Sequence, residues 1–199
     1  MQKLLIATQN QAKKEQFRFL FSDWKVELYF LDDLDFKLKI VEDGKTAQEN
    51  AEIKVRAFLD KVDLPVLGDD AGIEIEALNN EPGLQARRWN GLLAENVSDE
   101  VWLDYLLKRL EKSENKSNLG RYRAAWVVGW PKGPIFHQEV ILPFKISRDQ
   151  LYPYPKGNPM AAIELHPQKL VPIESLPKTE RYLFLKKILD HWVEVKRLF

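Results

Sequence analysis

Residues 66–75 read VLGDDAGIEI, and they place two adjacent carboxylates between apolar segments. The flanking residues 65–67 and 73–77 have the composition of two short strands, so we predict that residues 69–72 form a turn between them. Two neighbouring carboxylates repel each other and need water or a cation, which makes the pair costly unless a ligand uses it. The stretch therefore predicts an acidic corner at the end of a buried strand, suited to a magnesium ligand or a base for water. A simple Asp-Gly type of turn is the structural alternative.

The composition is that of an ordinary globular protein. The 199 residues are 45% hydrophobic and 11% aromatic, which is enough for one substantial core, and we expect a single domain over residues 1–199. Thirty basic residues balance thirty acidic residues, so no large field is available to hold a nucleic acid polymer or an anionic membrane. Any phosphate that the protein binds must be held by local contacts.

The absence of cysteine excludes disulfides, thiol nucleophiles and thiolate metal sites. The histidines at 137, 166 and 191 have no ligand-like spacing, so we expect no zinc site. The apolar run in MQKLLIATQN is too short for a signal peptide, and no stretch approaches the length needed to cross a bilayer. These features favour a cytoplasmic protein.

Helical and strand patterns are mixed along the chain without strict alternation. A short apolar strand at residues 4–7 leads into a helix whose apolar positions include Phe17, Leu20 and Phe21. The remaining expected elements are a strand (25–31), a charged connection (32–45), a helix (46–62), a turn (79–83), a helix after Ser98 (to about 111), a hairpin (121–130 and 135–146), a loop (147–160) and a last helix (178–195). We therefore expect an α/β fold with a mixed, twisted central sheet and flanking helices.

The junction between the first strand and the first helix contains Thr8, Asn10 and Lys13. A helix N-terminus presents unpaired N–H groups and partial positive charge, and hydroxyl, amide and ammonium groups add donors that suit phosphate. The alternative is that Thr8 or Asn10 only caps the helix.

A second acidic turn, Glu42-Asp43-Gly44, precedes the next helix, on which Glu49, Asn50 and Lys54 lie. Taken alone, this group is typical of a solvated surface. This acidic turn lies in the sequence between the strand–helix junction at residues 8–13 and the Asp69-Asp70 pair. The order of these three groups along the chain is more informative than any one of them alone.

Three stretches together resemble the inosine triphosphate pyrophosphatase family of nucleotide pyrophosphatases. They are LLIATQNQAKKEQF (4–17), VEDGKTAQENAEIKVRA (41–57) and LPVLGDDAGIEIEALNNEPGLQARRWNG (64–91). The corresponding family patterns are A-T-x-N-x-x-K, E-E-T-G-x-T-x-x-E-N-A-x-x-K-A and L-P-x-x-x-D-D-S-G-L-x-V-x-A-L-x-x-x-P-G. The agreement is collinear up to about residue 91, and the later hairpin also fits the family.

The resemblance implies two lobes around a substrate cleft, a homodimer, and Mg²⁺-dependent cleavage between the α- and β-phosphates of a nucleoside triphosphate. It makes Asp70 the catalytic carboxylate that binds metal and activates water, with Glu42 as the second metal ligand and Asp69 as support. The family pattern E-E-T-G is one residue shorter here, which makes Glu42 the less direct of the two assignments. The substrate-binding residues that the resemblance implies are Thr8, Asn10, Lys13, Lys54, Ala71, Lys169 and Arg181. Ala71 replaces a serine that is common in the family, and so lacks its hydroxyl.

The carboxy-terminal third departs from the family. The family pattern G-F-G-Y-D-P, which holds the purine, is effectively absent at residues 147–153, and S-H-R becomes Thr179-Glu180-Arg181. Glutamate in place of histidine turns a hydrogen-bond donor into a charged acceptor. Tyr152 or Tyr154 could stack on a base, or could pack on the sheet.

The phosphate end of the site therefore matches the family while the base end does not. We expect an active pyrophosphatase with altered or broad base preference, because lost polar contacts change specificity strongly. Two alternatives remain open at this point: a non-catalytic nucleotide-binding or regulatory protein, and an enzyme of the same fold that acts on another diphosphate-containing substrate.

Overall fold

The computed structural model describes residues 2–94 and 96–199, which form two compact units. Unit 1 comprises Met1–Asp70, Ala124–Val140 and Tyr182–Phe199, and unit 2 comprises Ala71–Arg123 and Ile141–Arg181. The single domain expected from the length of the chain stays a prediction.

The strands of the described residues form one seven-stranded mixed sheet in the order β2-β1-β3-β5-β6-β7, and β4 pairs with β3. β1 is parallel to both β2 and β3, whereas β4 is antiparallel to β3 and β7 is antiparallel to β6. The strands are β1 (Gln2–Ile6), β2 (Val26–Phe30), β3 (Val66–Ile75), β4 (Glu81–Gly83), β5 (Leu119–Gly129), β6 (Ile135–Ile146) and β7 (Glu164–Leu165). The helices are α1 (Gln11–Leu20), α2 (Ala47–Leu59), α3 (Asp99–Lys112), α4 (Lys178–Arg181), α5 (Leu183–His191) and α6 (Val193–Lys196). The predicted α/β class with a mixed sheet and flanking helices is confirmed.

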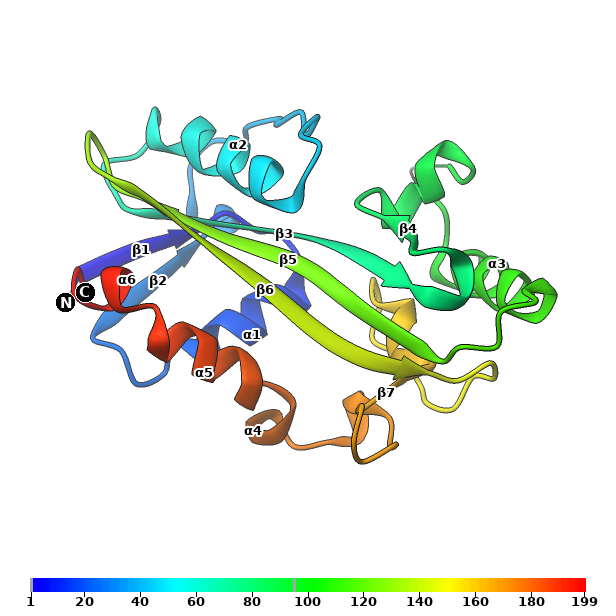
Figure 1. The fold of residues 1–199 in the computed structure, drawn as a ribbon. Helices are drawn as coiled ribbons and strands as arrows, with labels where there is room; N and C mark the ends of the chain where they lie inside the picture. The colour runs from blue at the N-terminus through cyan, green and yellow to red at the C-terminus, as the bar shows by residue number, and fades with distance from the viewer. Residues whose placement is uncertain (1, 95) are drawn as a thin grey trace. The chain divides into compact units, whose positions relative to one another are not determined.

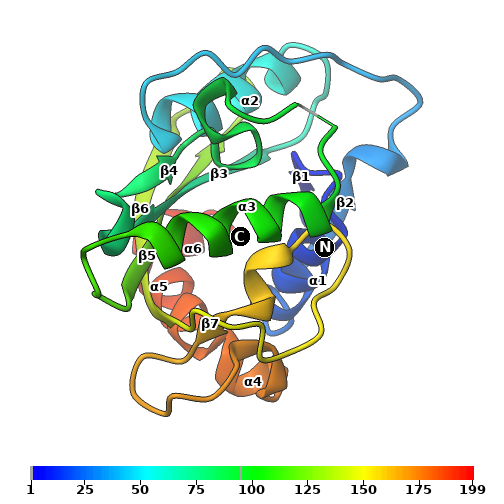
Figure 2. The same cartoon turned by 90° about the vertical axis from the view of Figure 1, so that its right-hand side faces the viewer.

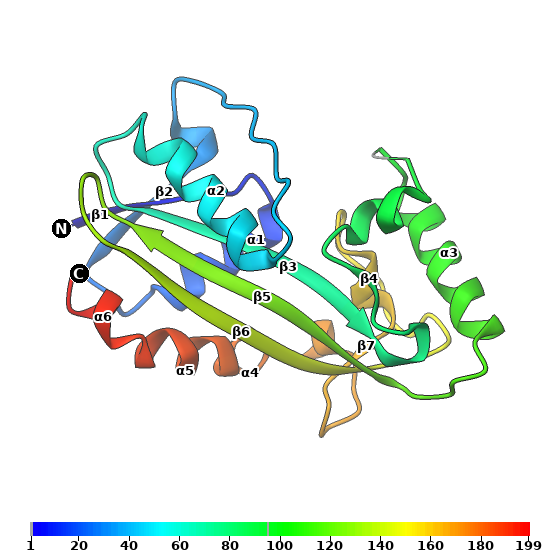
Figure 3. The same cartoon turned by 45° about the horizontal axis from the view of Figure 1, so that its top comes forward.

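In unit 1, α2 covers one face of the strands, and α1 and α5 lie on the other (Figures 1 and 3). The apolar face of α2 is buried, as its helical spacing predicts: Ala47, Ala51, Val55 and Phe58. Gly68 of β3 allows α2 to approach closely, because a Cβ atom there would lie 2.4 Å from the carbonyl oxygen of Ala51. This close approach brings the polar residues of α2 next to the carboxylate of Asp70.

The predicted turn at residues 69–72 is wrong, because β3 runs without interruption from Val66 to Ile75. Gly72 is not a turn residue. A Cβ atom on Gly72 would lie 3.0 Å from the backbone of Gly83, so the glycine permits close pairing of β3 with β4. The reversal of the chain comes later, at Asn79 and Asn80, which have positive φ angles of 54° and 65°.

In unit 2, α3 packs its apolar face on the core through Trp102, Leu106 and Leu110, and it lies beside the 3₁₀ turn Pro159–Ala162 (Figure 2). Ser98 caps α3 as predicted, because its hydroxyl accepts a hydrogen bond from the backbone N–H of Val101.

The predicted last helix over residues 178–195 is broken into α4, α5 and α6. Trp192 has φ −77° and ψ 75°, outside the helical region, and its side chain is buried. The apolar periodicity continues through this position, which is why the sequence suggests one helix. Among the described residues, no helix combines the length and apolar character that spanning a membrane requires.

Candidate functional site

The junction between β1 and α1 is shaped by Asn10. Its side chain accepts hydrogen bonds from the backbone N–H groups of Ala12 (2.9 Å) and Lys13 (3.2 Å), and its own N–H donates to the hydroxyl of Thr8 (3.2 Å). Asn10 is thus the N-cap of α1, as the capping alternative predicts. Capping leaves Thr8 and Lys13 fixed at the start of a helix whose dipole favours anions.

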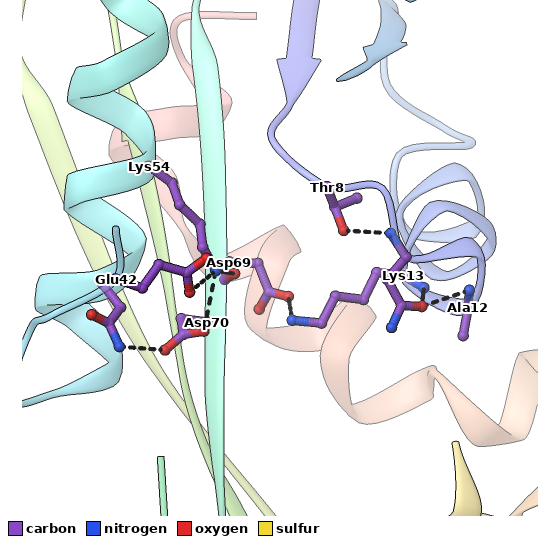
Figure 4. A network of polar contacts seen from close by, with 9 residues as sticks. Thr8, Ala12, Lys13, Glu42, Lys54, Asp69 and Asp70 are labelled. Atoms are coloured by element: carbon purple, nitrogen blue, oxygen red, sulfur yellow. Dashed lines mark hydrogen bonds and ion pairs between the residues drawn. The ribbon is translucent and has the colours of Figure 1, made fainter. Parts of the chain in front are cut away.

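Lys13 contacts Asp69 and not Asp70. Its Nζ lies 2.5 Å from Oδ2 of Asp69, whose side chain is only 6% exposed (Figure 4). Successive side chains of a strand point to opposite faces, so Asp69 faces α1 while Asp70 faces α2. A carboxylate buried this deeply requires a partner, and Lys13 supplies it.

Asp70 belongs to a second cluster, which is built on α2 and the loop before it. Nζ of Lys54 lies 3.1 Å from Oδ1 of Asp70, 2.8 Å from Oε2 of Glu42 and 3.1 Å from the carbonyl oxygen of Asp69 (Figure 4). One ammonium group therefore gathers two carboxylates that lie 28 residues apart in the sequence, since Glu42 precedes α2 and Asp70 lies on β3. Glu42, Lys54 and Asp70 thus converge in unit 1, and their roles in binding stay predictions.

Burial works against the charge on Lys54, but the carboxylates of Asp70 and Glu42 outweigh it. The result is a pKa above the ordinary value of 10.5. Lys54 is therefore a permanent cation in this site.

Asn50 is a buried residue of the cluster, with an exposure of 6%. Its Nδ2 donates to Oδ2 of Asp70 (3.1 Å), and its Oδ1 accepts from the backbone N–H of Gly44 (2.8 Å). A Cβ atom at Gly44 would lie 2.6 Å from Oδ1 of Asn50, so only glycine permits this contact without a shift. Asn50 thus fixes both Asp70 and the loop that carries Glu42.

From the sequence, Asn50 belongs with Glu49 and Lys54 to a group that is typical of a solvated surface, and no separate role is predicted for it. An amide one turn before Lys54 is a signal that could have been used, because residues four apart on a helix share a face.

The donor set around Lys54 fits a magnesium ion that is shared with a substrate. Mg²⁺ in phosphate-transfer sites is held by one or two carboxylates and by substrate phosphates. Glu42 and Asp70 supply two carboxylate oxygens that already flank one cationic group. Within residues 2–94 and 96–199, no group of three or more Asp, Glu, His or Cys side chains is placed to hold a metal ion by itself. The residues therefore suit a shared ion better than a structural one.

A pocket of about 250 Å³ adjoins this cluster in unit 1. Glu42 and Lys54 lie at its lining together with Thr8 and Gln9 from the β1–α1 junction. The pocket thus brings residues of the β1–α1 junction together with Glu42 and Lys54 on one concave surface.

The other predicted substrate-binding residues lie in unit 2. Ala71 is half-buried in β3. Lys169 pairs with Glu180. Arg181 forms an ion pair with Glu174 and donates to the carbonyl oxygens of Glu174 (2.8 Å) and Leu176 (3.1 Å), so it holds the preceding turn.

Tyr154 is partly buried against the core of unit 2, in agreement with the packing alternative for this residue. A buried carboxyl of unit 2, Glu164, accepts a hydrogen bond from the hydroxyl of Tyr122 (3.1 Å). Burial raises the pKa of Glu164 to about 7; the Tyr122 hydroxyl opposes the shift and the charge of Glu174 adds to it. No role for Glu164 is predicted from the sequence.

This chain is similar to known proteins in both sequence and fold. The chain is 42% identical over 109 residues to a dITP/XTP pyrophosphatase of Thermoanaerobacter pseudethanolicus, which covers 55% of this chain and 54% of that protein. It is 34% identical over 116 residues to a dITP/XTP pyrophosphatase of Staphylococcus aureus, and this match covers 58% of this chain and 57% of that protein. The matched stretch thus spans little more than half the length of these curated relatives.

The fold is similar to that of a HAM1 protein from Coxiella burnetii, with a TM-score of 0.80 and 22% identity over 100% of this chain and 98% of that chain. The sequence model of the Ham1 family matches residues 4–148, which include all the residues of the two clusters described above. The match ends where the sequence loses the family's base-binding patterns. Since it covers well over half of the chain, it confirms the resemblance found in the sequence, and the chain belongs to the Ham1 family.

Proposed function

We propose that this protein is a nucleoside triphosphate pyrophosphatase that hydrolyses the bond between the α- and β-phosphates to give a monophosphate and pyrophosphate. The observation that carries the proposal is the convergence of Glu42 and Asp70 on Lys54, beside a pocket that also includes Thr8. Hydrolysis of a triphosphate requires cationic groups that bind the phosphates and a carboxylate that accepts a proton from the attacking water. The cluster contains groups of both kinds. The dITP/XTP pyrophosphatase relatives support the same activity.

In this proposal Lys54 and Lys13 turn from their carboxylate partners to phosphate oxygens when the substrate binds. Oδ1 of Asp70, released from Lys54, then accepts a proton from the water that attacks the α-phosphorus. The bond from the α-phosphorus to the bridging oxygen breaks, and pyrophosphate leaves with the electron pair. Asn50 keeps the carboxylate oriented through Oδ2.

Glu42 and Asp70 would hold Mg²⁺. The bound ion supplies positive charge to the phosphate oxygens, which the protein's own groups do not provide in surplus. The three carboxylates of Glu42, Asp69 and Asp70 already outnumber the two lysines that they contact.

The substrate is proposed to be a non-standard purine triphosphate or a broader set of triphosphates. The names of the relatives favour the first, and the altered residues near Arg181 favour the second. The homodimer and the cytoplasmic location expected from the sequence are part of the same proposal.

The test is pyrophosphate release from a panel that includes ITP, XTP, dUTP and the ordinary triphosphates, with Mg²⁺ and with EDTA. Asp70→Asn should reduce turnover at least about 100-fold, since it removes the base. Asp104→Asn is the matched control, because Asp104 is an exposed carboxylate paired with Lys108 on the surface of unit 2. Turnover that survives in Asp70→Asn or in EDTA would contradict the proposal. Saturable binding of a triphosphate without hydrolysis would favour the non-catalytic alternative.

A further inference from the structure

The proposed site in unit 1 has a charge deficit. Lys13 pairs with Asp69, and Lys54 pairs with both Glu42 and Asp70. Each predicted phosphate-binding lysine is therefore already neutralised by carboxylates. A triphosphate brings about four negative charges at neutral pH, so a further cation is needed where its terminal phosphates lie.

Lys37 supplies a further cation at the pocket beside this cluster. It lines the same 250 Å³ pocket as Thr8, Glu42 and Lys54, and its side chain has no ion pair or hydrogen bond with any part of the chain that the structure describes. From the sequence, Lys37 is only one residue of the charged connection over residues 32–45.

The loop that carries Lys37 is anchored on both sides. The ring of Phe36 lies 6.5 Å from the ring of Phe58 on α2, and Leu34 and Ile40 pack against the apolar cluster around Val55. Apolar residues thus alternate with charged residues along the loop, and the apolar ones hold it on unit 1. The position of Lys37 at the pocket is a consequence of this packing.

We propose that Lys37 binds the β- and γ-phosphates of the substrate, and so the pyrophosphate product. This inference rests on the proposed pyrophosphatase function. An ammonium group without a carboxylate partner can offer its full charge to a phosphate, whereas Lys13 and Lys54 must first give up a partner. Lys37 is therefore a product-side binding residue, distinct from the cluster that holds Asp70.

The experiment compares Lys37→Gln with Lys39→Gln. Lys39 lies on the same exposed loop and loses the same charge, but it does not line the pocket. Binding of inorganic pyrophosphate with Mg²⁺ is measured by calorimetry, and a nucleoside monophosphate serves as a ligand that lacks the terminal phosphates. Lys37→Gln should weaken pyrophosphate binding about 5- to 10-fold, which is the effect of losing one exposed charge-assisted contact, and leave monophosphate binding unchanged. Lys37→Arg should restore most of the affinity, since it keeps the charge.

Kinetics separate this inference from the proposed function. Lys37→Gln should lower kcat/KM for a triphosphate and raise the inhibition constant for pyrophosphate by similar factors, while Lys39→Gln should change neither. If the native protein hydrolyses no triphosphate, the proposed function is overturned. If Lys37→Gln still binds pyrophosphate more weakly than the native protein in that case, the role of Lys37 is supported. Equal pyrophosphate affinities in Lys37→Gln and Lys39→Gln would overturn the role of Lys37, whatever the turnover.

Discussion

The buried carboxyl group of Glu164 should make the stability of the protein depend on pH. Its pKa is about 7 in the folded state, against an ordinary value of 4.5, and burial is the largest cause. Because the folded state binds the proton more tightly than the unfolded chain, the stabilisation is complete below about pH 4.5 and is lost as the pH rises through about 7. Each pH unit in this window lowers the free energy of unfolding by about 1.4 kcal/mol.

From about pH 5.5 to about pH 8, the contribution of Glu164 should fall by about 2 kcal/mol, since most of the loss occurs below the folded-state pKa. Glu164→Gln has a similar shape and does not titrate, so it should lack this component. The measurement is urea denaturation of the native protein and of Glu164→Gln at both pH values. All other titrating groups are shared, and the difference between the two pH dependences isolates Glu164.

Tyr122→Phe gives a second test with an opposite sign. The Tyr122 hydroxyl stabilises the carboxylate form, so its removal should raise the pKa of Glu164 further and enlarge the loss of stability toward high pH. If the native protein and Glu164→Gln show the same change in unfolding free energy between the two pH values, the assignment of a protonated, buried Glu164 is refuted.

Two further predictions concern the framework of the site. Gly68→Ala should lower the free energy of unfolding by about 1–3 kcal/mol, because the new Cβ atom would lie 2.4 Å from the carbonyl oxygen of Ala51; an unchanged calorimetric melting temperature would contradict the close packing of α2 on β3. Asn10→Ala should cost about 1 kcal/mol in chemical denaturation through loss of the α1 cap, as should the matched cap variant Ser98→Ala, but only Asn10→Ala should also raise KM for a triphosphate. Equal KM values in the two variants would assign Asn10 a capping role alone.

The elements that could be predicted from sequence are those with a strong local pattern. α2 and α3 have apolar residues at helical spacing, and Thr46 and Ser98 begin them as caps. The hairpin of β5 and β6 follows from two long apolar runs with a proline- and glycine-rich connection. In these cases, local propensity and tertiary packing favour the same structure.

The errors occur where tertiary contacts decide the conformation. Charged residues at 69 and 70 are typical of a turn, but Lys13 and Lys54 neutralise them within a continuous strand. The helix also breaks at Trp192, whose side chain is buried, and no local pattern in the sequence reveals this break.

The residues of the candidate site differ in how far they could be predicted from the sequence. The resemblance to the family identified the acidic and basic positions, and the structure brings Glu42, Lys54 and Asp70 together. The role of Asn50 could not be predicted from the sequence, because it depends on which amide atom faces Asp70 and which faces Gly44 in the folded protein.

The alternation of Asp69 and Asp70 across β3 makes the alignment of this strand with β1 critical. Leu5 pairs with Val66 and Ile6 with Leu67, and this register directs one acid toward each of two helices. A slip by a single residue would exchange the two acids between helices and turn apolar side chains outward. An insertion or deletion in the first half of β3 should therefore abolish the site even where the protein still folds. Length changes in the loop after β2 would leave Asp69 and Asp70 in place, although that loop carries Glu42.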